Sequence, residues 1–140
     1  MTLEDFSRIL ELRRLMKFEA QEIDNAHEQA TSITSHITGM PHGSGGVGSM
    51  VENACVRADV HLERYVRYEK ELDGIFARLK QESETLSEDQ SKVIKNYYIE
   101  NLRVGAIAKK MEISERHVFR LKKEAIGLLC GKNLPTSAIQ

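Results

Sequence analysis

The stretch LSEDQSKVIKNYYIENLRVGAIAKKMEISERHVFRLKKEAI, residues 86–126, decides the fold of the C-terminal part of this 140-residue chain. Its apolar residues are spaced so that two short helices, joined by a sharp turn, share one small core. The core positions are Ile107, Ala108, Met111, Ile113, Val118 and Leu121. This spacing predicts a helix-turn-helix, an arrangement that places its second helix in a groove of DNA.

A third helix is expected to precede this pair. Ser87 and Gln90 have the spacing of a capping box, in which a hydroxyl and an amide side chain satisfy the first free N–H groups of a helix. Asn101 tolerates the left-handed conformation that commonly ends a helix. The inner face between these two signals is expected to be Val93, Ile94, Tyr97 and Tyr98.

The helix-turn-helix itself has equally local boundaries. Its first helix is expected from about Val104 to Met111, followed by a turn at Glu112 and Ile113. Ser114 is placed as the N-cap of the second helix, which should begin at Glu115. Helical spacing then turns three apolar residues toward the core: Val118, Leu121 and Ala125.

The opposite face of the second helix is the predicted DNA-binding face. Arg116 and Arg120 are four residues apart and can each donate two hydrogen bonds to a guanine edge, whereas lysines suit phosphates. The predicted DNA-binding residues are Ser114, Glu115, Arg116, His117, Phe119, Arg120, Lys122, Lys123, Lys109 and Lys110. The alternative is a solvated helix face on which Glu115 and Glu124 pair with the cations.

The N-terminal part predicts one long amphipathic helix. Thr2 and Asp5 resemble a capping box, and a glycine-rich loop should follow at 39–49, where five of the nine glycines lie. Between them, apolar residues recur at steps of three and four at Ile9, Leu12, Met16, Ala20, Ile23, Ala26, Ala30, Ile33 and Ile37.

A second long helix is expected after the loop, with Ser49 and Glu52 as its capping box. One set of residues repeats every seven positions: Val51, Ala58, Tyr65, Leu72 and Leu79. A second set, offset by four, completes the expected coiled-coil seam: Cys55, Leu62, Glu69 and Phe76. Glu69 is unusual in a seam, and either pairing with a cation of the first helix or reaching solvent would explain it.

Each long helix has only a stripe of apolar surface and must bury that stripe against another helix. An antiparallel hairpin within one chain satisfies this requirement, and so does exchange of helices between two chains. The predicted fold is therefore all-α: a long antiparallel, coiled-coil-like hairpin over 1–84, a helix-turn-helix domain over 85–132, and a flexible tail over 133–140.

Charge is distributed unevenly along the chain. The formal net charge is -1, but residues 1–84 carry 10 basic and 15 acidic side chains, whereas residues 85–140 carry 10 and 6. A cationic end joined to an anionic one suits a protein that contacts phosphate with one part only. With 41% apolar residues and no stretch of membrane-spanning length or signal-peptide pattern, the expected protein is soluble and cytoplasmic.

The sequence predicts no enzymatic, metal or cofactor site. The five histidines are scattered, and the glycine-rich loop lacks the flanking strand and terminal Lys-Ser or Lys-Thr of a phosphate-binding loop. A metal face formed by Cys55, Asp59 and His61 is the alternative. Cys55 and Cys130 are expected to be reduced, small and buried, with a disulfide between them as the alternative.

The segment AIAKKMEISERHVFRLKKEAI, residues 106–126, resembles the fourth region of bacterial sigma factors, which reads the promoter element at minus thirty-five. A long helix, a glycine-rich loop and another long helix before such a domain are similar in layout to the RinA and ArpU-like group of phage and prophage regulators. This resemblance implies control of late phage genes in a bacterial host. Glu112 departs from the glycine usual in this turn, Arg103 from the usual Ser or Thr cap, and Ala106 from a common Glu.

The leading functional hypothesis is a transcription regulator that binds double-stranded DNA in a sequence-specific manner. Its long helices would form a homodimer or contact RNA polymerase, since one recognition helix touches few phosphates. A small terminase-like DNA-packaging or assembly subunit is a second hypothesis. A protein-only adaptor, in which the helix-turn-helix binds a protein partner, is the third.

Overall fold

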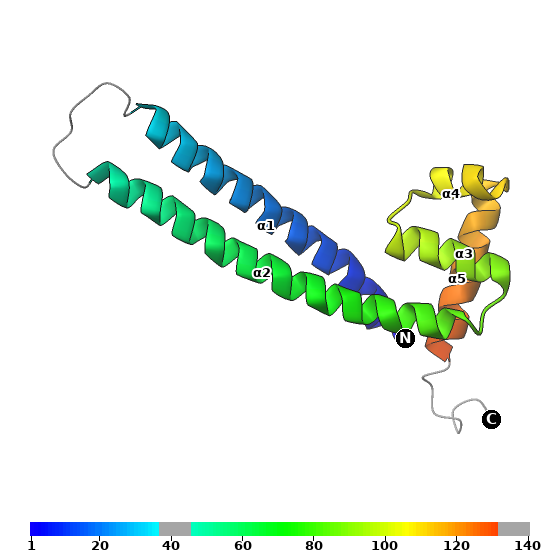
Figure 1. Cartoon of the computed structure of the whole chain (residues 1–140). Helices are drawn as coiled ribbons and strands as arrows, with labels where there is room; N and C mark the ends of the chain where they lie inside the picture. The colour runs from blue at the N-terminus through cyan, green and yellow to red at the C-terminus, as the bar shows by residue number, and fades with distance from the viewer. Residues whose placement is uncertain (37–45, 132–140) are drawn as a thin grey trace. The chain divides into compact units, whose positions relative to one another are not determined.

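The computed structural model describes residues 1–36 and 46–131, and the side chains of residues 33–49 lie outside the description. Every element in the described part is helical, which confirms the all-α class (Figure 1). The helices are α1 (Leu3–His36), α2 (Gly46–Ser83), α3 (Glu88–Ile94), the π-helical turn η1 (Lys95–Ile99), α4 (Val104–Met111) and α5 (Glu115–Gly131). The predicted tail over 133–140 lies outside the described residues.

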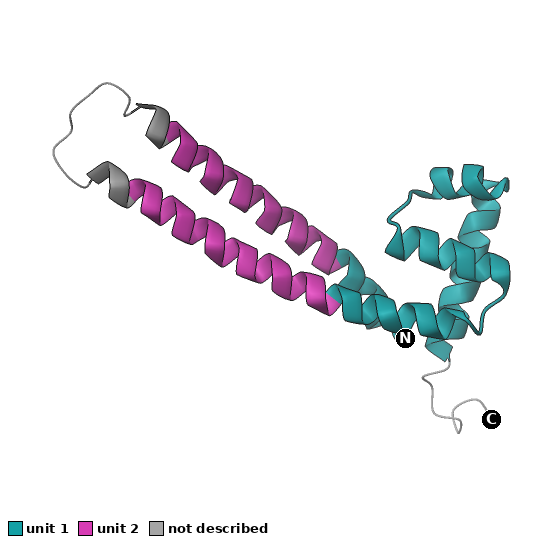
Figure 2. Cartoon of the chain, in the orientation of Figure 1, with its two compact units in different colours: residues 1–10, 72–140 teal, residues 11–71 magenta. Residues whose placement is uncertain are grey.

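The chain forms two compact units, shown in Figure 2. One unit contains residues 1–10 together with residues 72–140, and the other contains residues 11–71. The beginning of α1 and the end of α2 therefore belong to the same unit as the C-terminal helices. A ring contact between Phe6 and Tyr98, with centroids 4.8 Å apart, joins α1 to the C-terminal helices within this unit.

The two long helices pack against each other in antiparallel order, as predicted. In the unit of residues 11–71, Glu19 contacts His61, and farther along α1 Gln29 accepts a hydrogen bond from Arg57. As residue numbers rise along α1 from Glu19 to Gln29, the contacted residues of α2 fall from His61 to Arg57, so the two helices run antiparallel. On α1, Ile9, Leu12 and Ala26 are buried and Met16, Ala20, Ile23 and Ala30 are half-buried, which confirms these positions of the expected apolar face. The side chains of Ile33 and Ile37 lie outside the described residues.

The start of α2 differs from the prediction. The helix begins at Gly46, three residues before the expected capping box of Ser49 and Glu52, so that box is wrong. Residues 46–49 of the expected loop are helical, and residues 39–45 lie outside the described part. Glycine disfavours a helix by about 1 kcal/mol per residue relative to alanine, but this cost does not forbid a helical first turn.

The α2 seam confirms one predicted heptad set and corrects the other. The set of Val51, Ala58, Tyr65, Leu72 and Leu79 faces inward as buried or half-buried residues. Its companion set is offset by three residues and consists of Ala54, His61, Tyr68 and Ile75. In a coiled-coil seam, successive inward-facing residues are separated alternately by three and four positions. The prediction placed the companion residues four positions after each member of the first set, and those positions lie on the flank of the helix. Of the rejected set, Cys55, Leu62 and Glu69 are exposed and Phe76 is half-buried.

The polar element of the seam is a pair of side chains between the two helices. Glu19 is only 3% exposed, and its Oε2 lies at hydrogen-bonding distance from His61 Nδ1. Arg64 NH1 lies 3.9 Å from the other carboxylate oxygen of Glu19. A buried carboxylate requires such partners, because burying an unpaired charge is costly.

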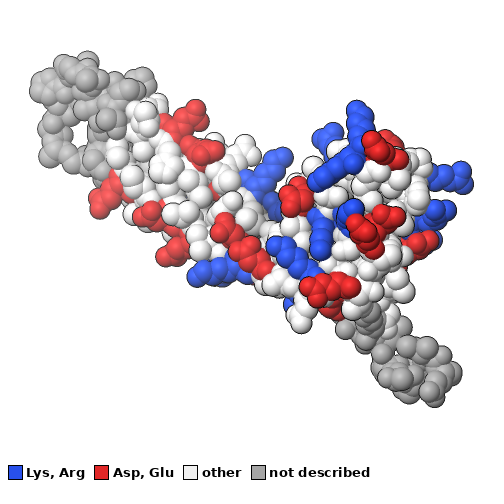
Figure 3. Space-filling view, turned by 45° about the vertical axis from the view of Figure 1, so that its right-hand side comes forward, with Lys and Arg blue, Asp and Glu red and all other residues white. Residues whose placement is uncertain are grey.

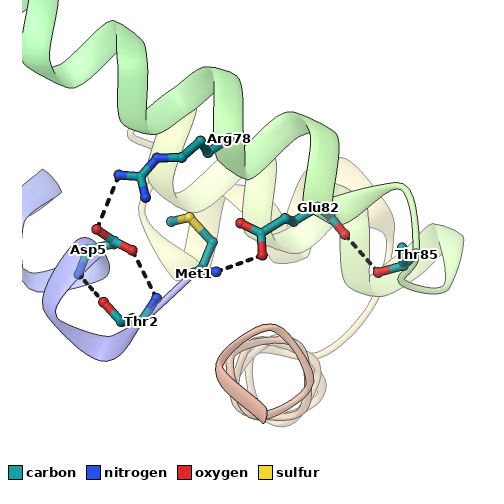
Figure 4. Close-up of polar contacts among 6 residues, drawn as sticks. All are labelled: Met1, Thr2, Asp5, Arg78, Glu82 and Thr85. Carbon is teal, nitrogen blue, oxygen red and sulfur yellow. Dashed lines mark hydrogen bonds and ion pairs between the residues drawn. The ribbon is translucent and has the colours of Figure 1, made fainter. Parts of the chain in front are cut away.

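The base of the hairpin is fixed by the contacts drawn in Figure 4. The amino group of Met1 lies 2.6 Å from Glu82 Oε1, and Arg78 NH2 donates to Asp5 Oδ1 at 3.3 Å. The Thr2 N–H donates to Asp5 Oδ2 at 2.9 Å and the Asp5 N–H donates to Thr2 Oγ1 at 3.2 Å, which confirms the predicted capping box. Burial would raise the pKa of Asp5, but the hydrogen bond from Thr2 and the charge of Arg78 together lower it.

Candidate nucleic-acid interface

The C-terminal helices begin where the sequence indicates. Ser87 Oγ accepts from the Gln90 N–H at 3.3 Å while Gln90 Oε1 accepts from the Ser87 N–H at 3.3 Å, which confirms the capping box of α3. The helix then loosens into η1, where the Glu100 N–H bonds the Lys95 carbonyl at 3.0 Å. Asn101 ends it with φ of 57°, the left-handed conformation expected there.

One compact apolar cluster supports the helix-turn-helix. It consists of Val93 from α3, Ile107 and Ala108 from α4, and Val118 and Leu121 from α5. Packed against it are the half-buried residues Tyr97, Leu102, Val104, Met111 and Ile113. Because the cluster joins three helices, it fixes the crossing of α4 and α5, and the predicted core is confirmed.

The turn between α4 and α5 has the predicted bounds. Glu112 adopts the left-handed conformation, with φ of 57° and ψ of 43°, and its neighbour Ile113 bonds the Ala108 carbonyl at 3.0 Å. A side chain in this conformation costs roughly 1 kcal/mol, which the surrounding core offsets. Ser114 Oγ then accepts from the His117 N–H at 3.1 Å, so Ser114 is the cap of α5 as expected.

Six of the ten predicted DNA-binding residues line one shallow groove on the outer side of α5. They are Ser114, Arg116, His117, Phe119, Arg120 and Lys123. Within the groove, Arg116, Arg120 and Lys123 are exposed, and the Phe119 side chain is 55% exposed. Figure 3 shows Lys and Arg side chains standing out from the C-terminal helices. An apolar ring among free guanidinium groups matches what the edges of base pairs offer.

The other four predicted residues lie away from this groove. Lys109 is exposed on α4, and Lys110 Nζ donates to Asn96 Oδ1 at 3.3 Å. The ammonium of Lys122 lies 3.7 Å from the centroid of the Tyr97 ring, a cation–π contact, and the side chain is half-buried.

Glu115 is turned toward α4. A Cβ atom added at Gly105 would lie 3.1 Å from Glu115 Oε1, so this carboxylate sits against the first turn of that helix. The N-cap of α4, Arg103, makes no side-chain capping bond. A negative charge near a helix N-terminus is favourable, because the free N–H groups there carry partial positive charge.

A second depression lies on the side of α3, η1 and α4. It is lined by Asp89, Lys92, Lys95, Asn96, Glu100, Lys110 and Met111. Lys92 also forms an ion pair with Glu88 at 2.9 Å. This depression is lined by both lysines and carboxylates, whereas the α5 groove is lined by cations without a carboxylate. The sequence prediction did not include Lys92 or Lys95, because they precede the helix-turn-helix.

Tyr98 and the two cysteines lie outside the α5 groove, and their burial determines how readily they ionise. Burial raises the pKa of Tyr98 to about 12, with smaller contributions from Tyr97 and Cys130, so its hydroxyl stays neutral. Cys55 and Cys130 are free, and Cys55 is exposed, so its predicted burial is wrong. Burial also raises the pKa of the half-buried Cys130 thiol, which disfavours the reactive thiolate.

Among the side chains that the structure describes, no group of three or more His, Cys, Asp or Glu residues is placed to hold a metal ion. No described helix is long and apolar enough to cross a membrane.

The capped turn, the shared core and the cationic groove together constitute a helix-turn-helix that exposes its second helix. Residues 84–129 match the family model "Sigma-70, region 4". No curated protein and no solved structure gave a match. The match covers the capping residue of α3, the α4–α5 turn and the groove, and it indicates DNA binding connected with transcription.

Proposed function

We propose that this protein is a transcription regulator that binds double-stranded DNA in a sequence-specific manner through α5. The observation that carries the proposal is the groove in which Arg116, Phe119, Arg120 and Lys123 are presented together on one helix face. The sigma-70 region 4 match over the same helices supports a role at promoters.

The groove side chains divide into those that read bases and those that hold phosphates. Arg116 and Arg120 are one helical turn apart, so both guanidinium groups reach the same side and can each bind a guanine edge through two N–H groups. Phe119 offers an apolar contact for a thymine methyl group. Lys123, with Lys109 of α4, is suited to phosphates, which position the helix without reading sequence.

The hairpin supplies a second function, which is self-association or contact with RNA polymerase. One recognition helix makes too few phosphate contacts for tight binding at physiological salt, and a second attachment raises the effective affinity. The layout of helix, glycine-rich segment and helix before the C-terminal helices resembles the RinA and ArpU-like regulators. We therefore place this protein in the cytoplasm of a bacterial host, controlling late genes of a phage or prophage.

The test is a selection of duplex fragments from the encoding genome by the full-length protein at physiological salt. The wild type should enrich one upstream region, and the double variant Arg116→Ala, Arg120→Ala should not. The matched control is Arg67→Ala, Lys70→Ala, which removes the same charge from exposed positions of α2 and should retain the enrichment. Equal recovery of all fragments by wild type and groove variant would refute sequence-specific binding through α5.

A further inference from the structure

Two adjacent tyrosines of η1 connect the beginning of α1 with the core of the helix-turn-helix. Tyr97 packs against the apolar cluster of that core, whereas the Tyr98 ring lies 4.8 Å from the Phe6 ring of α1. The two tyrosine rings also contact each other edge to face, with centroids 4.8 Å apart. Phe6, Tyr98 and Tyr97 therefore form a continuous aromatic bridge within the unit of residues 1–10 and 72–140.

The aromatic bridge is a packed structure. Tilted and edge-to-face rings at these centroid separations are the arrangements that aromatic pairs prefer. Phe6 and Tyr98 are buried, and Tyr97 is half-buried. Because protein interiors contain few voids, a ring in such a row cannot be displaced without affecting the ring beside it. A change at Phe6 is therefore transmitted to Tyr97.

The first end of the aromatic bridge is fixed by the first turn of α1. The Phe6 N–H donates to the Thr2 carbonyl at 3.4 Å, in the turn that Thr2 and Asp5 cap. Asp5 also accepts a hydrogen bond from Arg78 of α2 at 3.3 Å. The beginning of α1 is thus tied to the end of α2, which gives the Phe6 ring a fixed position.

The other end of the aromatic bridge reaches α5 at Lys122. The ammonium group of this lysine lies 3.7 Å from the Tyr97 centroid and 5.9 Å from the Tyr98 centroid. A cation over the faces of aromatic rings is attracted by their π electrons. The groove residues Phe119 and Lys123 lie within one helical turn of Lys122 on the same helix. A contact that holds Lys122 therefore also constrains the angle of the α5 groove.

Two neighbouring lysines of α5 have different surroundings. Lys123 is exposed and lines the groove, whereas Lys122 is half-buried over the tyrosine rings. To bind a phosphate, Lys122 would have to leave these rings and lose the cation–π attraction. The surroundings therefore suit Lys123 to a phosphate contact and Lys122 to holding the helix.

We propose that the aromatic bridge and Lys122 orient α5 for DNA, and that Phe6 is a positioning residue for the recognition helix although it belongs to α1. Lys122 then contributes to binding through the orientation of α5 and not through a phosphate contact. This inference rests on the proposed function, but the dependence of α5 on Phe6 can be measured without DNA.

The first experiment compares NMR spectra of the full-length protein without DNA. Phe6→Leu keeps an apolar side chain but removes the ring. It should shift the Lys122 ε-CH2 protons, which sense the ring currents of the tyrosines, and the backbone amide resonances of the groove residues. The matched control is Leu10→Ala: Leu10 is 45% exposed on the same helix, so its loss should leave these resonances unchanged.

Circular dichroism should show wild-type helix content for both variants. If Phe6→Leu loses helix, Phe6→Met replaces it, because an unbranched methionine adapts to irregular space. Unchanged Lys122 and groove resonances in a folded Phe6 variant would overturn the proposal. This comparison uses no DNA, so it decides the role of Phe6 even if the wild type binds no duplex and the proposed function fails.

The second experiment measures binding of a duplex from the enriched upstream region at several salt concentrations. Each phosphate contact contributes about 0.9 to the slope of log K against log salt, so Lys123→Ala should lower the slope by about that amount. Lys122→Ala should weaken binding about two- to fivefold, the usual strength of an exposed cation–π contact, and leave the slope unchanged. An equal loss of slope in both variants would show that Lys122 contacts a phosphate and would overturn its positioning role.

A double-mutant cycle tests whether Phe6 and Lys122 act through the same bridge. Phe6→Leu should weaken DNA binding by about two- to tenfold, the range expected for one aromatic pair. Combined with Lys122→Ala, it should weaken binding by less than the product of the two single effects, because both changes interrupt one row of contacts. Two effects that simply multiply would refute the connection between them.

Discussion

The buried Glu19–His61 pair makes a quantitative prediction about the stability of the hairpin. Glu19 is 3% exposed and the His61 side chain is 18% exposed, so removing the imidazole leaves a carboxylate with little access to water. Breaking a buried pair in this way costs about 3–5 kcal/mol. Arg64 remains 3.9 Å from the same carboxylate and the site is not fully closed, so His61→Ala should cost about 2–3 kcal/mol.

The matching double variant separates pairing from packing. Glu19→Leu together with His61→Leu replaces both polar groups by apolar ones and should be neutral or more stable than wild type, since well-packed apolar residues avoid the desolvation of two polar side chains. Urea unfolding followed by circular dichroism at 222 nm gives each free energy. His61→Ala within about 0.5 kcal/mol of wild type, the value for ordinary surface substitutions, would refute the reasoning that Glu19 depends on His61.

Other parts of the chain give three shorter predictions. Ser114→Ala removes the cap of α5 and should destabilise the C-terminal unit by about 1 kcal/mol in thermal unfolding. Arg120→Ala should reduce preference at one base pair by about 1–3 kcal/mol in a binding-site titration, whereas Lys109→Ala should weaken all duplexes alike and lower the salt dependence. The pKa of Asp5 is lowered in the folded state, so its contribution to stability is present above the ordinary value near 3.8 and is lost as the pH falls below it. Acid unfolding should therefore depend less steeply on pH in Arg78→Ala, and an unchanged slope would argue against their contact.

Local signals in the sequence determined most of the described helices. The hydroxyl groups of Thr2, Ser87 and Ser114 cap helices where they were expected, because a cap depends only on residues within one helical turn. Glu112 takes the left-handed turn although it is not glycine. The cost of that conformation is small beside the packing of α4 and α5, which the apolar spacing also predicted.

The companion set of the α2 seam was predicted wrongly because it depends on how a neighbouring helix packs. The α2 sequence contains apolar residues at Cys55 and Leu62 as well as at Ala54, and its own periodicity admits either companion set. The packed set includes His61, which no apolar pattern selects, because its partner Glu19 lies 42 residues earlier in the chain. Seams between distant segments are set by such pairs, which sequence spacing alone does not reveal.

Sequence spacing also could not show which of the predicted DNA-binding residues contact other parts of the domain and which line the α5 groove. A helical projection assigns Glu115 and Lys122 to the outer face from the angle of each residue around the helix. Both side chains are long and flexible, however, and can bend back against neighbouring elements. Glu115 folds against Gly105 at the positive end of α4, and Lys122 extends over Tyr97, so each charge already has a favourable interaction inside the domain. Arg116 and Arg120 line the exposed groove. We therefore propose that base recognition falls to the two arginines, whereas the Glu115 carboxylate lies against the first turn of α4.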